Sequence, residues 1–267
     1  MTTTIYGVGV GPGAPDLLTL RAQTLLRSCP VLILPRSNDH APSMAWTIAR
    51  RVVGDVPGQE RIFVTLPMSK DPARLRPAWA KAFARIDEKI AQGSSVAFLT
   101  EGDPSLFSSF VYLAREAPRR WPTVKVEIVP GVSSLAAVAA ATGVPLADGQ
   151  ERIAIIPANY GTADLVEVLR AFDTVVLMKI GAELPNLRRA LIETGLLDKA
   201  VYVTRASMPD ERIVRDLRTL PAETPGDCFT MVVVAKKSAS GVLMGDVPEI
   251  PRGAINSVPP VSPSEGA

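Results

Sequence analysis

The chain has 267 residues, enough for one large domain or two modest domains with their own hydrophobic cores, which excludes a disulfide miniprotein. Hydrophobic residues make up 47% and charged residues 21%, as in ordinary globular proteins, and the aromatic content of 5% argues against a stacking surface for nucleic acid. The formal net charge is only +2, so an anionic partner would have to be bound by local groups.

The positions of the two cysteines and the hydropathy of the sequence indicate where in the cell the protein is located. Cys29 and Cys228 are far apart and outside any CxxC or Cys/His cluster, which predicts neither a disulfide nor a metal site and favours a reducing compartment. Residues 1–13 lack the pattern of an export signal, and the most apolar window, 135–147, is shorter than the roughly 20 residues of a membrane helix. We therefore expect a cytoplasmic protein without membrane, nucleic-acid or metal partners.

Apolar, β-branched runs alternate with helical patterns in the first part of the chain. Strands are predicted at 5–10, 31–34, 62–66 and 96–100, and helices at 16–26, 43–53, 74–92 and 105–116, with Asp16 as the cap of the first helix. Fully apolar strands alternating with helices are typical of a parallel sheet covered on both faces. We expect an N-terminal α/β domain over residues 1–120, followed by a linker at 118–122.

A second α/β domain is predicted over residues 121–245. Its strands are expected at 124–129, 152–156, 174–178, 200–203 and 229–235, and its helices at 133–142, 163–171 and 184–195. Residues 246–267 contain five prolines and almost no large apolar side chain. Such a composition cannot build a core, so we expect a disordered tail.

Glycines at alternate positions from Gly7 to Gly13 end the first predicted strand. Their spacing allows a dinucleotide loop of the Rossmann kind, in which Arg36 would bind the 2'-phosphate of NADP. Pro12 and Pro15 argue against that interpretation, because they remove two N–H donors that such a loop needs. The alternative is a turn that presents its backbone to another ligand.

Two more turns follow predicted strands. Residues 100–106 contain Gly-Asp-Pro, and residues 129–134 contain two adjacent serines. Ligands bind beyond the carboxyl ends of parallel strands, so both turns could line a crevice, although ordinary turn and helix-cap chemistry also explains them. The single histidine, His40, lies in a polar loop typical of a solvated surface, and hydrolase motifs are absent.

Five segments together resemble, in this order, the tetrapyrrole (corrin/porphyrin) methylases of cobalamin biosynthesis. They are GVGVGPGAPDLLTLRA, TEGDPSLFSSFVYL, VPGVSSLAAVAAATGVPLADGQERIAIIP, VVLMKIG and YVTRASMPDERIVRDL. The likeness spans residues 5 to about 235. It is greatest to the branch that methylates C20 of precorrin-2, because Phe-Ser-Ser-Phe-x-Tyr-Leu follows Gly-Asp-Pro and Leu-Met-Lys opens a later loop.

The resemblance implies a two-domain class III α/β fold in which each domain is a mainly parallel or mixed sheet flanked by helices, with the ligand cleft between the domains. It also implies a homodimer, S-adenosyl-L-methionine as methyl donor and S-adenosyl-L-homocysteine as product. The implied cofactor-binding residues are Pro12, Gly102, Asp103, Leu106, Ser133, Ser134, Met178, Ala206 and Thr230.

The implied reaction is methylation of C20 of precorrin-2 to precorrin-3A, which needs alignment in a dry cleft more than a strong base. The tetrapyrrole substrate carries many carboxylates, for which Arg36, Lys179 and Arg205 are the candidate anchors. Glu101 is the candidate side chain to accept the C20 proton, with a backbone carbonyl or water as alternatives.

Other functions stay open at this point. Within the family, the alternatives are C20 methylation of cobalt-factor II and methylation of a corrin precursor at another position. Outside it, an NADP-dependent reductase would explain the first glycine loop and Arg36. A non-catalytic α/β binding module would explain the scarcity of acid–base residues, but it would leave the Gly-Asp-Pro and serine turns unexplained.

Overall fold

The computed structural model describes residues 2–69, 71–158, 164–221 and 229–236. The chain divides into two compact units, Met1–Ser134 and Leu135–Ala267. Cys228 and the expected tail at 246–267 lie outside the described residues.

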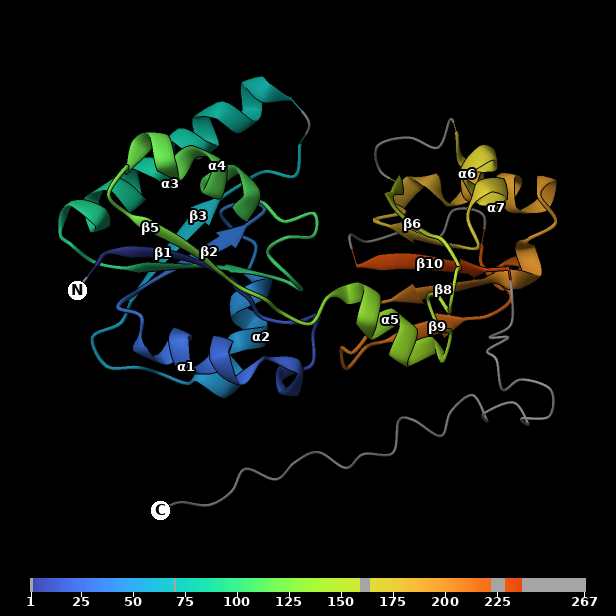
Figure 1. The fold of residues 1–267 in the computed structure, drawn as a ribbon, viewed down its shortest axis with the longest axis horizontal. Helices are drawn as coiled ribbons and strands as arrows, with labels where there is room; N and C mark the ends of the chain where they lie inside the picture. The colour runs from blue at the N-terminus through green and yellow to red at the C-terminus, as the bar shows by residue number, and fades with distance from the viewer. Residues whose placement is uncertain (1, 70, 159–163, 222–228, 237–267) are drawn as a thin grey trace, which may run out of the picture. The chain divides into compact units, whose positions relative to one another are not determined.

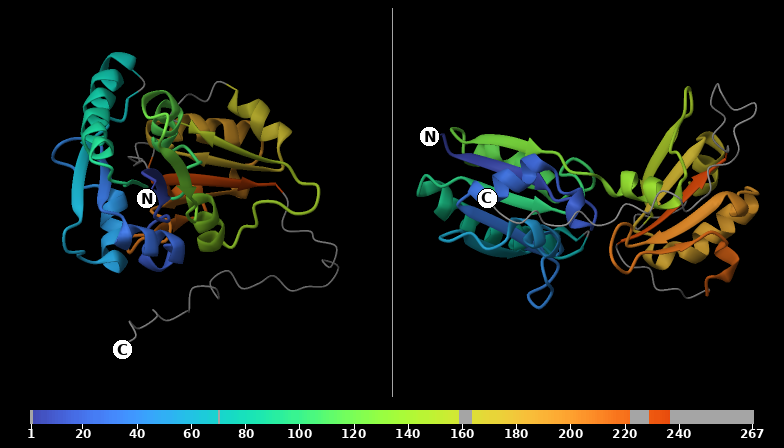
Figure 2. Two further views of the ribbon diagram at one scale, coloured as in Figure 1. Left: turned by 60° about the vertical axis from the view of Figure 1, so that its left-hand side comes forward. Right: turned by 90° about the horizontal axis from the view of Figure 1, so that it is seen from below.

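The first unit is a parallel five-stranded sheet in the order β3-β2-β4-β1-β5, with helices on both faces (Figures 1 and 2). The strands are β1 (Thr4–Gly9), β2 (Val31–Arg36), β3 (Glu60–Thr65), β4 (Val96–Thr100) and β5 (Lys125–Val129). The helices are α1 (Leu20–Ser28), α2 (Met44–Val53), α3 (Pro72–Ala91) and α4 (Phe110–Arg120). Helices α1 and α2 cover one face, and α3 and α4 cover the other.

The central strand β4 is apolar throughout because helices cover both of its faces. Val96 and Phe98 pack in the core beneath α3 and α4, whereas Ala97 and Leu99 pack in the core beneath α1 and α2. Successive strand residues point to opposite faces, so a strand covered on both sides has no polar face. This burial fixes β4, and with it the loop that follows it.

Two helices begin later than their sequences predict. The cap of α1 is Thr19, whose hydroxyl accepts from the Ala22 N–H, while Asp16 lies in a preceding 3-10 turn, so its prediction as the cap is wrong. Helix α4 begins at Phe110, because the Ser108 hydroxyl accepts from the Phe110 N–H at 3.1 Å and ends the loop there.

The expected domain boundary at residue 120 moves to Ser134–Leu135. Strand β5 pairs in parallel with β1, so residues 125–129 complete the first sheet. The predicted linker at 118–122 is corrected as well. Pro118 lies inside α4, and buried Trp121 donates its indole N–H to Asp87 at 2.9 Å.

The second unit is a mixed sheet in the order β6-β7-β10-β8-β9. Its strands are β6 (Ile153–Pro157), β7 (Thr174–Met178), β8 (Ala200–Thr204), β9 (Arg212–Val214) and β10 (Thr230–Ala235); β6 and β7 are parallel, and the other pairs are antiparallel. Its helices are α5 (Ser134–Thr142), α6 (Leu165–Ala171) and α7 (Leu184–Glu193). Helices α6 and α7 pack on one face and α5 on the other (Figure 1).

The predicted fold class is confirmed: a parallel sheet and a mixed sheet, each flanked by helices. The short strand β9 was not predicted. No described helix combines the length and hydropathy needed to cross a membrane. The cleft between the two units stays a prediction.

Candidate functional site

Three loops of the first unit meet where β1, β4 and β5 end, because β1 lies between the other two strands. Their backbones touch at Gly9, Gly102 and Gly131, which we call the glycine junction. A Cβ on Gly9 would lie 2.5 Å from the Gly102 carbonyl oxygen and 2.7 Å from the Gly131 nitrogen. Any side chain at Gly9 or Gly131 would force the loops apart.

Backbone hydrogen bonds join the first two loops. The Gly102 N–H donates to the Gly11 carbonyl at 2.7 Å, and the Gly11 N–H donates back at 3.3 Å. The Val10 N–H donates to the Thr100 carbonyl at 3.0 Å. Two amide groups of the glycine loop are therefore already used within the protein.

This bonding removes the support for a dinucleotide loop. Such a loop offers free N–H groups that lead directly into a helix, whereas here Gly11 is bonded to Gly102 and α1 begins only at Leu20. Arg36, the expected partner of a 2'-phosphate, is already paired with Asp39 at 3.0 Å. The geometry of this loop therefore does not support the hypothesis of an NADP-dependent reductase.

Asp103 connects the second loop to the third. Its Oδ1 accepts from the Ser105 N–H at 2.7 Å, and its Oδ2 accepts from the Gly131 N–H at 2.9 Å. One carboxylate thus satisfies a donor in its own turn and a donor beyond β5. Asp103 therefore holds the second and third loops in position relative to each other.

The remaining candidates of the first unit lie around this junction. A Cβ on Gly102 would lie 3.7 Å from the Ser134 nitrogen and 3.8 Å from the Ser133 Cα. Leu106 donates its N–H to the Asp103 carbonyl at 3.3 Å, and buried Pro12 directly follows Gly11. Five of the six predicted cofactor residues of the first unit therefore belong to these three connected loops, and the sixth, Ser134, begins helix α5 directly after the third loop.

The candidates of the second unit also gather at one end of a sheet. Strand β10 lies between β7 and β8, so the start of β10 meets the ends of both neighbours. The Lys179 N–H donates to the Thr230 carbonyl at 2.9 Å, and the Arg205 N–H donates to the Phe229 carbonyl at 3.1 Å. Met178 and Ala206, next to these two residues, are buried, as is Thr230.

Lys179 and Arg205 share an uncommon backbone conformation. Their φ angles are +56° and +54°, in the left-handed region that costs a residue with a Cβ free energy. Each lies directly after its strand, on either side of the start of β10. Arg205 also forms an ion pair with Asp210 at 3.1 Å and lies over the Phe229 ring.

Arg36 ends β2 and belongs to a small polar network. Its guanidinium binds Asp39 and the Thr65 hydroxyl, and the Thr65 hydroxyl donates to Asp39. The hydrogen bond from Thr65, followed by the charge of Arg36, holds the pKa of Asp39 below its ordinary value. Arg36 is therefore held in place, with part of its charge already compensated.

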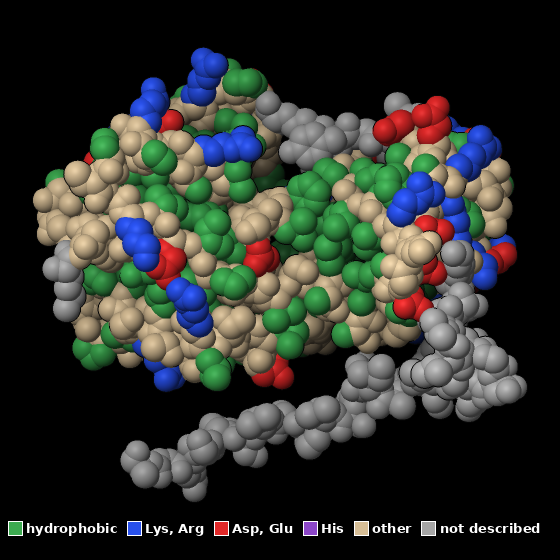
Figure 3. All heavy atoms as spheres, viewed as in Figure 1, with side chains coloured by type: hydrophobic (Ala, Val, Ile, Leu, Met, Phe, Trp, Pro, Cys, Tyr) green, Lys and Arg blue, Asp and Glu red, His purple; other side chains and the backbone are tan. Residues whose placement is uncertain are grey.

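Two further residues singled out in the sequence are exposed. Glu101 follows β4 and is exposed beside Gly102, and His40 is exposed in its loop. Among the described residues, no three His, Cys, Asp or Glu side chains form a metal-binding group. On the viewed face in Figure 3, basic and acidic side chains are interspersed, so charge recognition there depends on individual residues.

Sequence reasoning missed two features of this site. Gly9 and Gly131 were not identified as residues in direct backbone contact, although both lie in the glycine-containing turns that were singled out. Asp39 and Thr65, which hold Arg36, come from segments without a recognisable motif.

Comparison with known proteins identifies the family. Residues 4–221 match the Tetrapyrrole (Corrin/Porphyrin) Methylases. The chain belongs to this family. The recognition made from the five sequence segments is thereby confirmed.

The chain is also similar in sequence to individual methyltransferases of this family. The chain is 33% identical over 238 residues to the cobalt-precorrin-2 C(20)-methyltransferase of Salmonella typhimurium, covering 89% of this chain and 98% of that enzyme. It is 29% identical over 235 residues to the precorrin-2 C(20)-methyltransferase of a Sinorhizobium species, covering 86% and 94%.

A solved methylase structure shares the fold. The uroporphyrin-III C-methyl transferase from Thermus thermophilus, complexed with S-adenyl homocysteine, is 25% identical and superposes with a TM-score of 0.62. The match covers 87% of this chain and 97% of that enzyme.

Proposed function

We propose that this chain transfers a methyl group from S-adenosylmethionine to C20 of precorrin-2, giving precorrin-3A in cobalamin biosynthesis. The observation that carries the proposal is the likeness to a C20-methyltransferase over 98% of that relative's length. A second relative named for the same position acts on precorrin-2 rather than cobalt-precorrin-2. The position of methylation is common to both names, whereas the metal in the substrate differs.

The residues present fit S-adenosylmethionine. Around the glycine junction the loops carry glycines and serines, which leave main-chain groups accessible to a ligand. In the first unit, Pro12, Gly102, Asp103, Leu106, Ser133 and Ser134 would hold the cofactor, and in the second unit Met178, Ala206 and Thr230 would do so. When bound, the cofactor supplies an electrophilic methyl group on a sulfonium.

The protein's own residues then have three tasks. Arg36, Lys179 and Arg205 bind substrate carboxylates and fix the orientation of C20. The small, partly buried loops exclude water from the sulfonium. Glu101 takes the proton that leaves C20 once the new carbon–carbon bond has formed. A homodimer and a cytoplasmic location are part of this proposal.

The test is a calorimetric titration with S-adenosylhomocysteine, followed by reactions with precorrin-2 and with cobalt-precorrin-2. We expect micromolar binding and a product heavier by one methyl group, located at C20 by NMR. The preferred substrate decides between the metal-free and cobalt-loaded forms. A methyl group at another carbon would contradict the C20 assignment, and binding without methylation would contradict both substrates.

A parallel titration with NADPH tests the alternative enzyme class. The Gly11 N–H is bonded to Gly102 and helix α1 begins only at Leu20, so we expect no binding of NADPH. NADPH binding without S-adenosylhomocysteine binding would overturn the proposed function.

A further inference from the structure

Three side chains of the first unit hold the guanidinium of Arg36. Its Nη2 donates to Asp39 Oδ1 at 3.0 Å, and its Nε donates to the Thr65 hydroxyl at 3.2 Å. That hydroxyl donates to the same Asp39 oxygen at 2.5 Å. The guanidinium carbon lies 5.5 Å from the centre of the Phe63 ring. In the proposed function Arg36 binds a substrate carboxylate, whereas the three residues around it have no task.

The pairing of β2 with β3 brings these groups together. Arg36 is paired with Thr65 in the parallel register, and the Leu66 N–H donates to the Arg36 carbonyl at 2.9 Å. Alternate residues of a strand share a face of the sheet, so Phe63 lies on the same face as Thr65. Strand β3 is an edge strand, and Phe63 is 44% exposed there. One neighbouring strand thus supplies both the hydroxyl and the ring that contact Arg36.

The turn after β2 supplies Asp39. The Asn38 side-chain oxygen accepts from the His40 N–H at 3.0 Å and from the Ala41 N–H at 2.9 Å, which fixes the turn around Asp39. The Asp39 side chain is 73% exposed, so its ion pair with Arg36 contributes little to the stability of the fold. The pair instead fixes the direction of the guanidinium.

The network occupies only one edge of the guanidinium. Thr65 Oγ1 and Asp39 Oδ1 lie 2.5 Å apart, so they accept side by side from the adjacent Nε and Nη2 groups. A guanidinium carries five N–H groups in a rigid plane, which leaves the edge formed by Nη1 and the second N–H of Nη2. Among the described residues, Arg36 Nη1 has no hydrogen-bond partner, and 24% of the Arg36 side chain is exposed. The remaining edge fits the two oxygens of a carboxylate.

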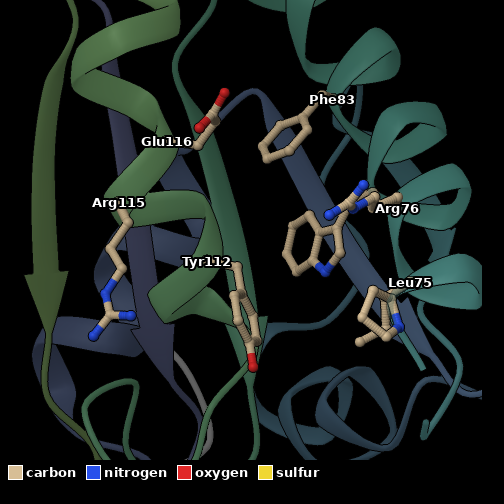
Figure 4. A pocket seen from close by; sticks show the side chains of 8 residues that line it. Leu75, Arg76, Phe83, Tyr112, Arg115 and Glu116 are labelled. Atoms are coloured by element: carbon tan, nitrogen blue, oxygen red, sulfur yellow. The ribbon is translucent and has the colours of Figure 1, made fainter. Parts of the chain in front are cut away.

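Other arginines of the first unit lack such a network. Figure 4 shows Arg76 and Arg115 beside an apolar groove between α3 and α4. Neither has an ion-pair or hydrogen-bond partner in the part of the chain that the structure describes. An arginine of this kind loses most of its rotamer freedom when it binds an anion, whereas Arg36 has already lost it in the ligand-free chain.

Arg36 also lies at the edge of the sheet that carries the candidate site. Strands β2 and β4 are parallel neighbours, so Arg36, the last residue of β2, and the loop after β4 leave the sheet at the same edge. With about 5 Å between neighbouring strands, β2 lies roughly 10 Å from β1, the central strand of the glycine junction. A tetrapyrrole with carboxylates at its rim spans such a distance.

We propose that Asp39 and Thr65, supported by the Phe63 ring, are positioning residues that hold Arg36 so that its Nη1–Nη2 edge binds one substrate carboxylate through two parallel hydrogen bonds. The inference rests on the proposed function, because it concerns one of the substrate contacts assigned there. The substrate does not displace Asp39, since the two carboxylates use different edges of the guanidinium.

Two substitutions of Asp39 separate hydrogen bonding from charge. Asp39→Asn and Asp39→Ala both remove the negative charge, but only asparagine keeps an oxygen that accepts from Arg36 and Thr65. The affinity of the full chain for precorrin-2 is titrated in the presence of S-adenosylhomocysteine, so that no methyl transfer takes place. We expect Asp39→Ala to bind precorrin-2 about fivefold more weakly than Asp39→Asn, because an unheld arginine must be immobilised on binding. The affinity for S-adenosylhomocysteine should be the same in both variants.

Substitutions of Thr65 give a second comparison. Thr65→Val removes the hydroxyl and keeps the shape of the side chain, whereas Thr65→Ser keeps the hydroxyl. We expect Thr65→Val to bind precorrin-2 about threefold more weakly than Thr65→Ser. In ¹⁵N-labelled chains without ligand, the Arg36 Nε–H signal, assigned from an Arg36→Lys variant, should exchange with water faster in Thr65→Val than in Thr65→Ser.

The matched control is a similar arrangement at the opposite edge of the same sheet. At the start of β3, Arg61 donates to Asp55 at 2.9 Å and lies over the Trp46 ring. Asp55→Ala and Asp55→Asn should bind precorrin-2 equally well, because this arginine lies away from the ends of the strands that carry the site.

Three results would overturn the positioning role. They are equal affinities of Asp39→Ala and Asp39→Asn for precorrin-2, an equally large difference between the two Asp55 variants, and equal exchange of the Arg36 Nε–H in the two Thr65 variants. Equal tightening of both Asp39 variants relative to the unmodified chain would show that the substrate displaces Asp39. An unmodified chain that binds neither precorrin-2 nor cobalt-precorrin-2 would instead overturn the proposed function, and this inference with it.

Discussion

The Asp103 side chain accepts two backbone hydrogen bonds, one from its own loop and one from the loop after β5. Its carboxylate accepts from the Ser105 and Gly131 N–H groups, so Asp103→Ala leaves two donors without their acceptor. We expect a loss of about 1–3 kcal/mol in the free energy of unfolding and at least tenfold weaker binding of S-adenosylhomocysteine. Urea unfolding and calorimetric titration measure the two effects.

Asp71→Ala is the matched control for this change. Asp71 also accepts a backbone N–H, from Ala73 at 2.8 Å, but at the start of α3. Its removal should cost about 1 kcal/mol of stability and leave the affinity for S-adenosylhomocysteine unchanged. Equal affinities of the Asp103→Ala variant and the unmodified chain would show that this loop lies outside the cofactor site.

Cys29 provides a pH-dependent prediction. Burial raises the pKa of its thiol from 9.0 to about 11, against a smaller opposing effect of a hydrogen bond to Val31. The thiol ionises first in the unfolded chain, so its contribution to stability is complete below pH 9 and is lost between pH 9 and 11. From pH 8 to 10 the chain should lose about 1 kcal/mol more than a Cys29→Ala variant does.

Urea unfolding of both proteins at the two pH values isolates this contribution, because the other titrating groups are common to both. An identical pH dependence would mean that the Cys29 thiol ionises as readily in the folded chain as in the unfolded one.

At the scale of elements, the contact among three loops depends on the absence of side chains. Gly131→Ala would place a Cβ 2.9 Å from the Gly9 Cα and still closer to the Gly102 carbonyl oxygen. Backbone cannot rotate away as a side chain can, so we expect a loss of about 3 kcal/mol or more and weaker S-adenosylhomocysteine binding.

Gly93→Ala separates this steric effect from the conformational freedom of glycine. Gly93 has φ of +74° and nothing within 4 Å of the position of a Cβ. The change should cost about 1–2 kcal/mol from backbone strain alone and leave ligand binding intact. If Gly131→Ala proves no more destabilising than Gly93→Ala, the close packing of the loops is not needed for stability.

The elements also show what the sequence can predict. Strands β4 and β7 occur at their predicted residues because both are buried on two faces and apolar throughout. Strand β5 was predicted as a strand but assigned to the wrong unit, since its partner β1 lies more than a hundred residues earlier in the chain. Local patterns encode an element, whereas its neighbours depend on the packing of the whole sheet.

For the candidate site as well, the sequence predicts individual residues but not all of their contacts. The resemblance to the family supplied Asp103, Ser133 and Thr230, and β-sheet topology brings each set of candidates within a unit together. The ion pair of Arg36 with Asp39 was not predictable, because its geometry also depends on Thr65 from another strand. Periodicity carries no information about which polar side chains meet across a sheet edge.

At the scale of the whole molecule, the proposed cofactor residues are divided between two units with separate cores. Unfolding of either unit would therefore destroy the proposed site. A ligand that binds only the complete site stabilises whichever unit unfolds first. At a ligand concentration of 100 Kd this stabilisation is about 2.7 kcal/mol, which raises the midpoint of that transition by on the order of 10 °C.

Two core variants, one in each unit, test whether the ligand stabilises whichever unit unfolds first. Leu113→Ala weakens the first unit and Leu187→Ala the second, each by about 2–5 kcal/mol, because both side chains are fully buried. Calorimetric scans with and without S-adenosylhomocysteine should show the lower transition raised in both variants. Protection of the Leu113→Ala variant alone would mean that the ligand binds only the first unit, and would remove Met178, Ala206 and Thr230 from the cofactor site.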